Sequence, residues 1–356
     1  RQVDKYLIYS YLFYFVTFLL SLSINGGKMR DLDTASRVVF FVPVLLLLLK
    51  YPIKTCVLSY SIPLGSIISL CVALYDKFIL NLRPEQNPRI MHIQGGDISM
   101  SLGIFSLIIA LYAHQKKDVK LTTLSVIGGL CGIVGSLLST ARGGWVALPV
   151  LLIVILYIYR HSLSKRFFLT FFGIIVVASI GISQMPNNRI MERINVAQKD
   201  IQLYLDKNNG NTSLGARFEM WKSAIAMAKE KPLFGWGIQG ATEKRKQETK
   251  EKIATGNIGQ FTHAHNQYLD DLSKRGIIGL LALLAVLFIP LRAFMKKLNT
   301  TNDEVKLIAT LGVAHILSVM IYGLSQGFLV HNSGTIFYFF LTIVFYAAIR
   351  THQKAE

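Results

Sequence analysis

The sequence predicts an all-α membrane protein that crosses a lipid bilayer about ten times. Of its 356 residues, 52% are hydrophobic and only 16% are charged, a combination that soluble globular domains rarely show. Apolar runs close to the length that spans a bilayer recur along the chain. None has Asp or Glu in its interior, and none shows the alternation typical of a membrane β-barrel. The runs are therefore expected to be helices.

The predicted spans form two blocks around a long polar segment. The first block, residues 1–184, holds seven spans, at about 6–24, 36–50, 53–76, 97–114, 120–139, 143–160 and 167–184. The polar segment covers residues 185–275. The second block, residues 276–356, holds three spans, at about 276–297, 305–327 and 333–352. The chain opens with Arg1, without a cleavable signal peptide, and two further helices before it would give twelve and keep the same orientation.

Short basic loops follow every second predicted span, which is the positive-inside pattern. Their basic residues are Lys116, Lys117 and Lys120; Arg160, Lys165 and Arg166; Lys296, Lys297 and Lys306; and Arg350 with Lys354. This pattern places both termini in the cytoplasm and the polar segment 185–275 on the opposite side. The net charge of +18 then reflects membrane orientation, and no nucleic acid partner is expected.

The polar segment is expected to be mostly helical. Ser213 is a candidate cap for a helix that starts near Ala216. A glycine-rich turn at 233–240 precedes a charged run at 242–252, which is expected to be a solvated helix or a lid. Residues 264–275 are expected to form an amphipathic helix. The helix that starts near Ala216 is predicted to carry an apolar stripe formed by Phe218, Trp221, Ile225 and Ala228.

Arg142 lies in a very short turn between two predicted spans, and two interpretations of it stay open. A long cation often marks a helix end by reaching toward the membrane surface. Alternatively, its guanidinium group is a rigid donor fork that suits the oxygens of a lipid-linked phosphate. Gly143 and Gly144 would then allow the phosphate to approach the backbone.

Arg217 is predicted to open the helix that starts near Ala216. A surface arginine is the simplest interpretation. A cation is unfavourable at a helix N-terminus unless an anion is bound there, and that end also offers free N–H donors to an anion. Arg142 and Arg217 on the same side of the membrane therefore suggest an anionic ligand.

His265 precedes a predicted span and is a candidate general base, because a neutral imidazole can take a proton from a hydroxyl group. A structural histidine is the alternative. Asp270 and Asp271 are candidate partners that orient it, and His331 is a weaker candidate on the same side. No metal site is expected: His263 lacks a third ligand, and the cysteines, Cys56, Cys71 and Cys131, lie inside predicted spans.

Three stretches in this order resemble the O-antigen ligase and polymerase superfamily of bacterial inner-membrane enzymes. The first is the turn 141–145 around Arg142. The second is Arg217 with Trp221 and Ala224, followed by the sequence Pro-Leu-Phe-Gly-Trp-Gly at 232–237. The third is His265-Asn266, then nine residues, then Gly276 and Gly279. With the long polar segment before the last three spans, the resemblance covers the whole chain.

The resemblance implies a metal-independent and cofactor-independent glycosyltransferase of lipopolysaccharide biosynthesis, with its active site on the periplasmic face of the inner membrane. Its donor would be an undecaprenyl-diphosphate-linked glycan, and its acceptor a sugar hydroxyl of lipid A–core. By position, Arg142 and Arg217 would hold the diphosphate and His265 would activate the acceptor. Residues in or beside the matched stretches are expected to bind substrate, namely Asn266, His263, Gly235, Trp236 and Gly237.

Other functions remain open from the sequence. An O-antigen polymerase would extend the lipid-linked glycan, and a protein O-oligosaccharyltransferase would move it to a protein. A flippase or permease for lipid-linked glycan belongs to a different class, and it usually needs polar or broken helices at the midplane of the membrane. The predicted spans are continuous and uncharged, which favours an enzyme.

The predicted topology can be tested with two single cysteines in a background without the native three. A membrane-impermeant thiol reagent applied to intact spheroplasts should label Lys246→Cys, because the polar segment is expected outside. It should leave Lys117→Cys unlabelled until the membrane is permeabilised. Labelling of Lys117→Cys alone would reverse the assignment of the two faces.

Overall fold

A computed structural model describes residues 2–82, 91–161, 163 and 189–352, and these residues confirm the all-α prediction. Twelve α-helices and three short 3-10 helices make up the secondary structure of this part, which contains no β-strand. Eight of the helices are long and apolar enough to cross a membrane, so the chain is a multi-pass membrane protein. The predicted span 167–184 lies outside the described residues.

The described spanning helices match the predicted apolar runs in order. They are α1 (Gln2–Asn25), α2 (Asp33–Lys50), α3 (Thr55–Phe78), α4 (His92–Gln115), α5 (Val119–Ser139), α11 (Gln267–Met295), α12 (Asp303–Tyr322) and α13 (Asn332–His352). α6 (Arg142–Tyr159) is also apolar but shorter. Two further short helices are η1 (Met29–Leu32) and η3 (Phe328–Val330).

One predicted boundary was wrong in a way that matters for the site. The span expected at 305–327 ends as α12 at Tyr322, and the chain then turns through residues 323–331 before α13 begins. Apolar residues on both sides of this turn hide it from a hydropathy scan, although it contains the buried side chain of Gln326.

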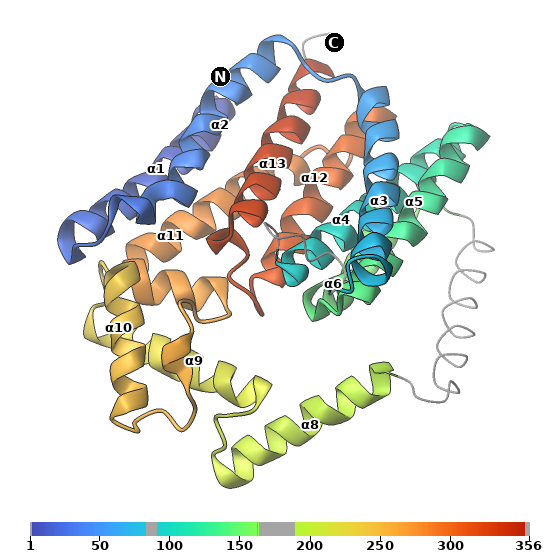
Figure 1. The fold of residues 1–356 in the computed structure, drawn as a ribbon. Coiled ribbons are helices and arrows are strands. Elements are labelled where there is room, and N and C mark those ends of the chain that lie inside the picture. The colour runs from blue at the N-terminus through green and yellow to red at the C-terminus, as the bar shows by residue number, and fades with distance from the viewer. Residues whose placement is uncertain (1, 83–90, 162, 164–188, 353–356) are drawn as a thin grey trace.

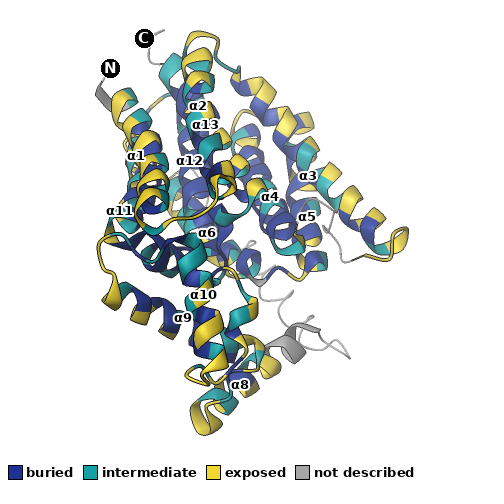
Figure 2. Ribbon diagram, turned by 60° about the vertical axis from the view of Figure 1, so that its left-hand side comes forward, coloured by how far each residue is buried: buried dark blue, intermediate teal, exposed yellow. Residues whose placement is uncertain are grey.

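The centre of the bundle is formed by α4, α12 and α13, whose apolar stretches are mostly buried. Figure 2 shows dark blue inner surfaces on these helices and yellow outer surfaces on α1 and α3. Exposed apolar side chains on peripheral helices suit a lipid environment, in which they need no protein cover.

Small residues bring α3, α4 and α5 close together. A Cβ atom on Gly132 would lie 2.5 Å from the backbone of Gly103, and one on Gly128 would lie 2.8 Å from Pro63. Glycine at such crossings lets helix backbones pack directly in a membrane. α4 also carries buried polar residues, among them Asp97, which lies inside the helix because α4 begins earlier than predicted.

The polar segment is helical, as predicted, and lies at one end of the bundle (Figure 1). It contains α8 (Arg189–Lys207), α9 (Ser213–Glu230), α10 (Gly237–Lys250) and η2 (Ile258–Gln260). The predicted cap was wrong by one residue: Thr212 caps α9 by accepting a hydrogen bond from the Gly215 N–H. The predicted apolar stripe was also wrong, because Ile225 is exposed and the buried face instead carries Met220, Ala224 and Met227.

The last helix of this segment begins at Gln267 and not at residue 264, and it continues into the membrane span as α11. A single left-handed residue, Gly276 (φ 64°, ψ −163°), interrupts it. The kink leaves backbone groups without partners inside the helix, and the turn 232–236 supplies them. The Ile277 N–H donates to the Pro232 carbonyl at 2.8 Å, and the Trp236 N–H donates to the Ser273 carbonyl at 2.9 Å.

Two glycines make this contact possible. Gly235 has φ +66°, and a Cβ there would lie 2.5 Å from the Lys274 carbonyl carbon. A Cβ on Gly276 would lie 2.3 Å from the Leu233 carbonyl. Each glycine thus faces the backbone of the opposite segment, and no larger residue fits at either position. We call this contact between residues 232–236 and 273–277 the glycine clamp.

Alanine at Gly235 or Gly276 is expected to lower the thermal stability of the purified protein strongly. A left-handed conformation alone costs a residue with a side chain about 1–2 kcal/mol, and the backbone overlap adds to this cost. Gly26→Ala separates the two effects, since Gly26 has φ +70° but a Cβ there would meet no atom within 4 Å.

Gly240→Ala in α10 serves as the helical control, because the nearest atom to its Cβ would be 3.7 Å away. This variant should be neutral or slightly stabilising. Melting temperatures measured in one detergent should fall in the order Gly240→Ala, Gly26→Ala, Gly235→Ala. A melting temperature of Gly235→Ala equal to that of Gly26→Ala would mean that the clamp adds no stability.

Candidate functional site

His265 lies in a loop, residues 261–266, and not in the helix that the sequence predicted. Its backbone is left-handed, with φ 49°, which is unusual for a residue with a side chain. Strain of this kind persists only where the surroundings fix the backbone. Side chains from the helices around the loop hold it at its start, its middle and its end.

Arg245 fixes the first part of this loop. It is fully buried, and its guanidinium group donates to the Phe261 carbonyl at 3.2 Å and to the Thr262 carbonyl at 3.0 Å. The sequence suggested that the charged run 242–252 is solvated, but Arg245 and Glu248 of α10 are buried. A guanidinium group with several fixed donors suits such a backbone contact.

Trp221 and Asp270 fix the middle of the loop. The Trp221 indole N–H donates to the Ala264 carbonyl at 3.1 Å, and the Ala264 N–H donates to Asp270 Oδ1 at 2.9 Å. The other oxygen of Asp270 forms a buried ion pair with Lys274 at 2.7 Å. Helices α9 and α11 thus hold both backbone polar groups of the same residue.

Asn266 ends the loop as the cap of α11. Its side-chain oxygen accepts from the Tyr268 and Leu269 N–H groups at 3.0 and 3.1 Å, and its amide nitrogen donates to the Leu324 carbonyl at 3.3 Å. These contacts give Asn266 a structural role next to His265. They also tie the loop 261–266 to the turn 323–331.

The His265 ring forms a hydrogen bond with Gln326, which the sequence pattern did not reveal. Nδ1 of His265 lies 2.8 Å from Gln326 Oε1, and the amide nitrogen of Gln326 lies 3.2 Å from Nε2 of His331. Asp270 and Asp271, which we had expected to orient the ring, do not contact it: Asp270 holds the loop backbone, and Asp271 pairs with Arg275.

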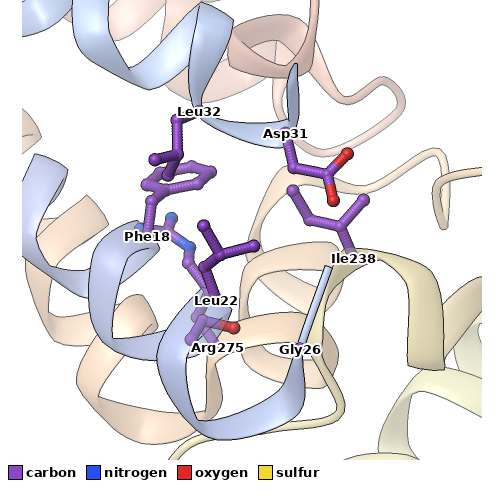
Figure 3. A pocket seen from close by; sticks show the side chains of 8 residues that line it. Phe18, Leu22, Gly26, Asp31, Leu32, Ile238 and Arg275 are labelled. Atoms are coloured by element: carbon purple, nitrogen blue, oxygen red, sulfur yellow. The ribbon is translucent and has the colours of Figure 1, made fainter. Parts of the chain in front are cut away.

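The Asp271–Arg275 ion pair lies between α11 and α1. The Arg275 guanidinium stacks on the Phe18 ring, 3.9 Å from its centre, and lines a small pocket with Leu22, Ile238 and Asp31 (Figure 3). A larger cavity of about 120 Å³ lies next to it, and Thr262 and Lys274 are among its lining residues. Two ion pairs lie at this cavity, Asp270 with Lys274 and Asp271 with Arg275. Because these charges are already paired, the cavity supports the loop more than it offers a free charge to a ligand.

His263 faces the same cluster. Its ring centre lies 4.3 Å from that of His265 and 5.5 Å from that of His331, although a helix would have turned the first two apart. Its Nε2 atom is buried and has no hydrogen-bond partner among the described residues. No group of three potential metal ligands occurs in the part of the chain that the structure describes.

Arg217 was expected at the N-terminus of α9, but it is the fifth residue of the helix. The N-terminal donors are already used, because the Gly215 N–H donates to Thr212 and the Leu214 N–H donates to Asp200 at 3.3 Å. The helix end therefore does not provide the anion site we expected. The side chain itself lies near His265: after burial, the positive charge of Arg217 contributes to lowering the pKa of His265.

Arg142 is the first residue of α6, and its side chain lies outside what the structure describes. The start of α6 packs on α4, where Met91 precedes the helix and lies 3.6 Å from the Gln326 amide. Arg142 thus begins its helix at the same end of the bundle as His265. The adjacent glycines have another neighbour: a Cβ on Gly143 would lie 3.0 Å from Asp97, so a carboxylate occupies the approach expected for phosphate.

The turn with Gly235, Trp236 and Gly237 does not face the histidine loop in any contact that the structure gives. Gly235 belongs to the glycine clamp, and Gly237 (φ +74°) packs on Asn25 at the end of α1. The Trp236 indole N–H donates to the Met227 carbonyl at 3.1 Å, and Lys231 stacks on its ring at 4.2 Å. All three residues have contacts within the fold that explain their type.

Burial keeps the histidines neutral. It lowers the pKa of His263 to about 3, with His265, Lys274 and His331 adding to the effect and Asp270 opposing it. Burial also lowers the pKa of His265, with Gln326 and Asp270 opposing and Arg217 adding, and it lowers the pKa of His331. A neutral His265 at neutral pH has one nitrogen available to accept a proton.

Comparison with known proteins adds independent information. A family model described as O-antigen ligase matches residues 127–284, which include Arg142, Arg217 and His265. An uncharacterized protein of Haemophilus influenzae is 44% identical over 342 residues, which cover 96% of this chain and 86% of that protein. An O-antigen ligase of Escherichia coli K12 is 25% identical over 193 residues, which cover 53% of this chain and 44% of the ligase.

Acidification is expected to destabilise the protein through His263. Since folding lowers the pKa of this group from about 6.5 to about 3, the stability that depends on its neutral form is complete above pH 6.5 and is lost as the pH falls below that value. Between pH 7 and pH 5 the loss should be roughly 2 kcal/mol. His263→Asn should therefore show a smaller drop in melting temperature between these pH values than the wild type.

His114→Asn is the matched control for this measurement, because His114 is exposed in the last turn of α4, and the start of that helix lies nearer the histidine loop. It should retain the full wild-type drop. An equal drop in the His263 variant and the wild type would show that the acid sensitivity comes from other groups.

Proposed function

This chain belongs to the O-antigen ligase superfamily, and we propose that it transfers glycan from undecaprenyl diphosphate to a sugar hydroxyl of lipid A–core. The site would lie on the periplasmic face of the bacterial inner membrane. A lipid-linked donor supports this placement, because its isoprenoid chain must stay in the bilayer while its glycan stays in water. The end of the bundle that carries α8–α10 is where polar residues and spanning helices meet (Figure 1).

The observation that carries the proposal is the geometry of His265. Its Nδ1 lies 2.8 Å from the buried Gln326 oxygen, and a proton on Nδ1 would satisfy that oxygen and leave the lone pair of the neutral ring on Nε2. The ring is only partly buried, and three helices fix the backbone of its loop. A positioned, neutral imidazole is what a general base for a hydroxyl group requires.

In the proposed reaction, the acceptor hydroxyl oxygen attacks the anomeric carbon of the donor sugar. Nε2 of His265 takes the hydroxyl proton as the new carbon–oxygen bond forms. The bond between the anomeric carbon and the diphosphate oxygen breaks, and undecaprenyl diphosphate leaves with the electron pair. Attack opposite the leaving group inverts the anomeric centre, by analogy with inverting glycosidases.

Arg142 and Arg217 are proposed to bind the diphosphate. Negative charge gathers on this group as the bond breaks, and fixed guanidinium donors in a site with little water stabilise it. The effect of Arg217 on the pKa of His265 supports a position close to the base. Asn266, His263 and the turn Gly235–Gly237 stay candidates for substrate contacts, in addition to the structural contacts described above.

Purified protein in lipid nanodiscs, supplied with undecaprenyl-diphosphate glycan and lipid A–core, should place glycan on the core. His265→Ala should bind donor normally but lose roughly 10²–10⁴-fold in transfer rate, the usual contribution of a positioned base. The wild-type rate should fall as the pH drops through the pKa of His265, which burial places below that of a free imidazole, because the protonated ring cannot accept a proton.

His114→Ala is the control and should keep the wild-type rate. Arg217→Lys keeps the charge but not the donor fork, so it should weaken donor binding. Longer glycan on undecaprenyl would identify a polymerase, and glycan on an added protein would identify a protein transferase. Donor that crosses the membrane of a vesicle without any transfer would identify a flippase and refute the enzyme proposal.

A further inference from the structure

We propose that Gln326 is a positioning residue that fixes His265 as the tautomer with its proton on Nδ1, and that Met91 and His331 set the orientation of the Gln326 amide. The inference rests on the proposed function for its meaning in catalysis. The tautomer itself can be measured without any substrate.

The first step is the environment of the amide. Gln326 is 1% exposed and lies in the turn between α12 and η3. Its oxygen is 2.8 Å from His265 Nδ1, and its nitrogen is 3.2 Å from His331 Nε2 and 3.6 Å from the Met91 sulfur. Both ends of the amide therefore meet protein groups.

The second step is the direction of the amide. A thioether sulfur accepts hydrogen bonds weakly and cannot donate one. If the amide were reversed, its oxygen would face the Met91 sulfur, which has no proton to donate, and its only possible donor would be an Nε2–H of His331. With His331 protonated on Nδ1, the observed direction gives both N–H groups an acceptor and gives the oxygen the Nδ1–H of His265. Since amide direction and tautomer are decided by such networks, the surroundings favour one assignment.

The third step is the consequence for His265. A neutral imidazole carries its proton on one nitrogen only, and a hydrogen bond to that nitrogen selects the tautomer. With the proton on Nδ1, the lone pair lies on Nε2, on the side of the ring away from Gln326. A reversed amide would stabilise the other tautomer, which has no lone pair on Nε2 and could not act as a base there.

This arrangement links the two outer histidines. A proton on Nε2 of His331, in the neutral Nε2–H tautomer or in the protonated ring, would place a donor there, so the amide oxygen would be drawn toward His331 and away from His265. The groups that face His265 include Arg217 on α9, Asp270 on α11 and His263 in the same loop, while His331 follows η3. Their combined field and burial favour neutral rings, which preserves the observed direction of the amide.

The tautomer can be read from imidazole nitrogen chemical shifts of the full chain, labelled with [¹⁵N]histidine in lipid nanodiscs. The signal of His265 is assigned by its loss in His265→Asn. In the wild type at pH 7.5, we expect Nδ1 to carry the proton. Gln326→Met should shift His265 toward the Nε2–H tautomer, which free histidine prefers.

The transfer assay supplies the second readout. Gln326→Met should lower the transfer rate roughly 10–100-fold without a change in donor affinity, the usual effect of removing a group that orients an active imidazole. Gln326→Glu should restore the Nδ1–H tautomer and most of the rate, because a carboxylate also accepts from Nδ1. It should also move the acid limb of the rate profile to higher pH, since a negative charge stabilises the protonated ring.

Two further variants keep the test decisive. His331→Leu leaves Gln326 in place but removes an acceptor, and it should give a mixture of tautomers. Gln239→Met removes a half-buried glutamine that instead bonds Asp31, and it should change neither readout.

An Nε2–H tautomer in the wild type, or an unchanged tautomer in both Gln326→Met and His331→Leu, would overturn the inference. If the predicted tautomers are seen but the wild type transfers no glycan, the positioning role stands and the proposed function fails.

Discussion

The candidate site depends on the hydrogen bonds that fix the backbone of residues 261–266. Arg245, Trp221 and Asp270 reach this loop from three different helices and bond to its peptide groups. The loop therefore needs no regular secondary structure of its own, and His265 can keep a left-handed backbone. Arg245 and Asp270 are charged and buried. Backbone carbonyl groups accept from Arg245, and Lys274 pairs with Asp270. A site positioned in this way is rigid before substrate binds, which is the main requirement for electrostatic catalysis.

The membrane-spanning part of the fold could be predicted from the sequence because length and apolarity are sufficient signals in a bilayer. Cap residues and faces of the polar helices could not be assigned so well. Serine is the better cap by residue type, yet Thr212 caps α9, and Asp200 of α8 accepts from the Leu214 N–H beside it. The stripe on α9 failed for a related reason, since burial there follows the neighbours of the helix and not its own periodicity alone.

The roles of the site residues stay predictions, but the structure bears on where some of them lie. Arg217 is near enough to His265 for its charge to lower the pKa of His265. Gln326 was missed because its turn is short and lies between strongly apolar residues, so it was counted within a span. Arg245 was missed because one buried arginine in a run of charges has no distinguishing pattern. One signal could have found Gln326: it is a polar residue in a turn directly after a spanning helix, on the same side as a candidate base.

The glycine clamp has a consequence for the order of folding. Residues 232–236 leave the ribosome before the residues of α11 against which they pack, and the acceptor groups of the clamp exist only once that helix is kinked at Gly276. The polar segment therefore cannot complete this contact before α11 has been synthesised. Its docking must wait for insertion of α11, and the loop 261–266 lies between the two partners of the clamp. The histidine loop is held in part by Asp270 and capped at the start of α11, so its contacts too are complete only after α11 has formed.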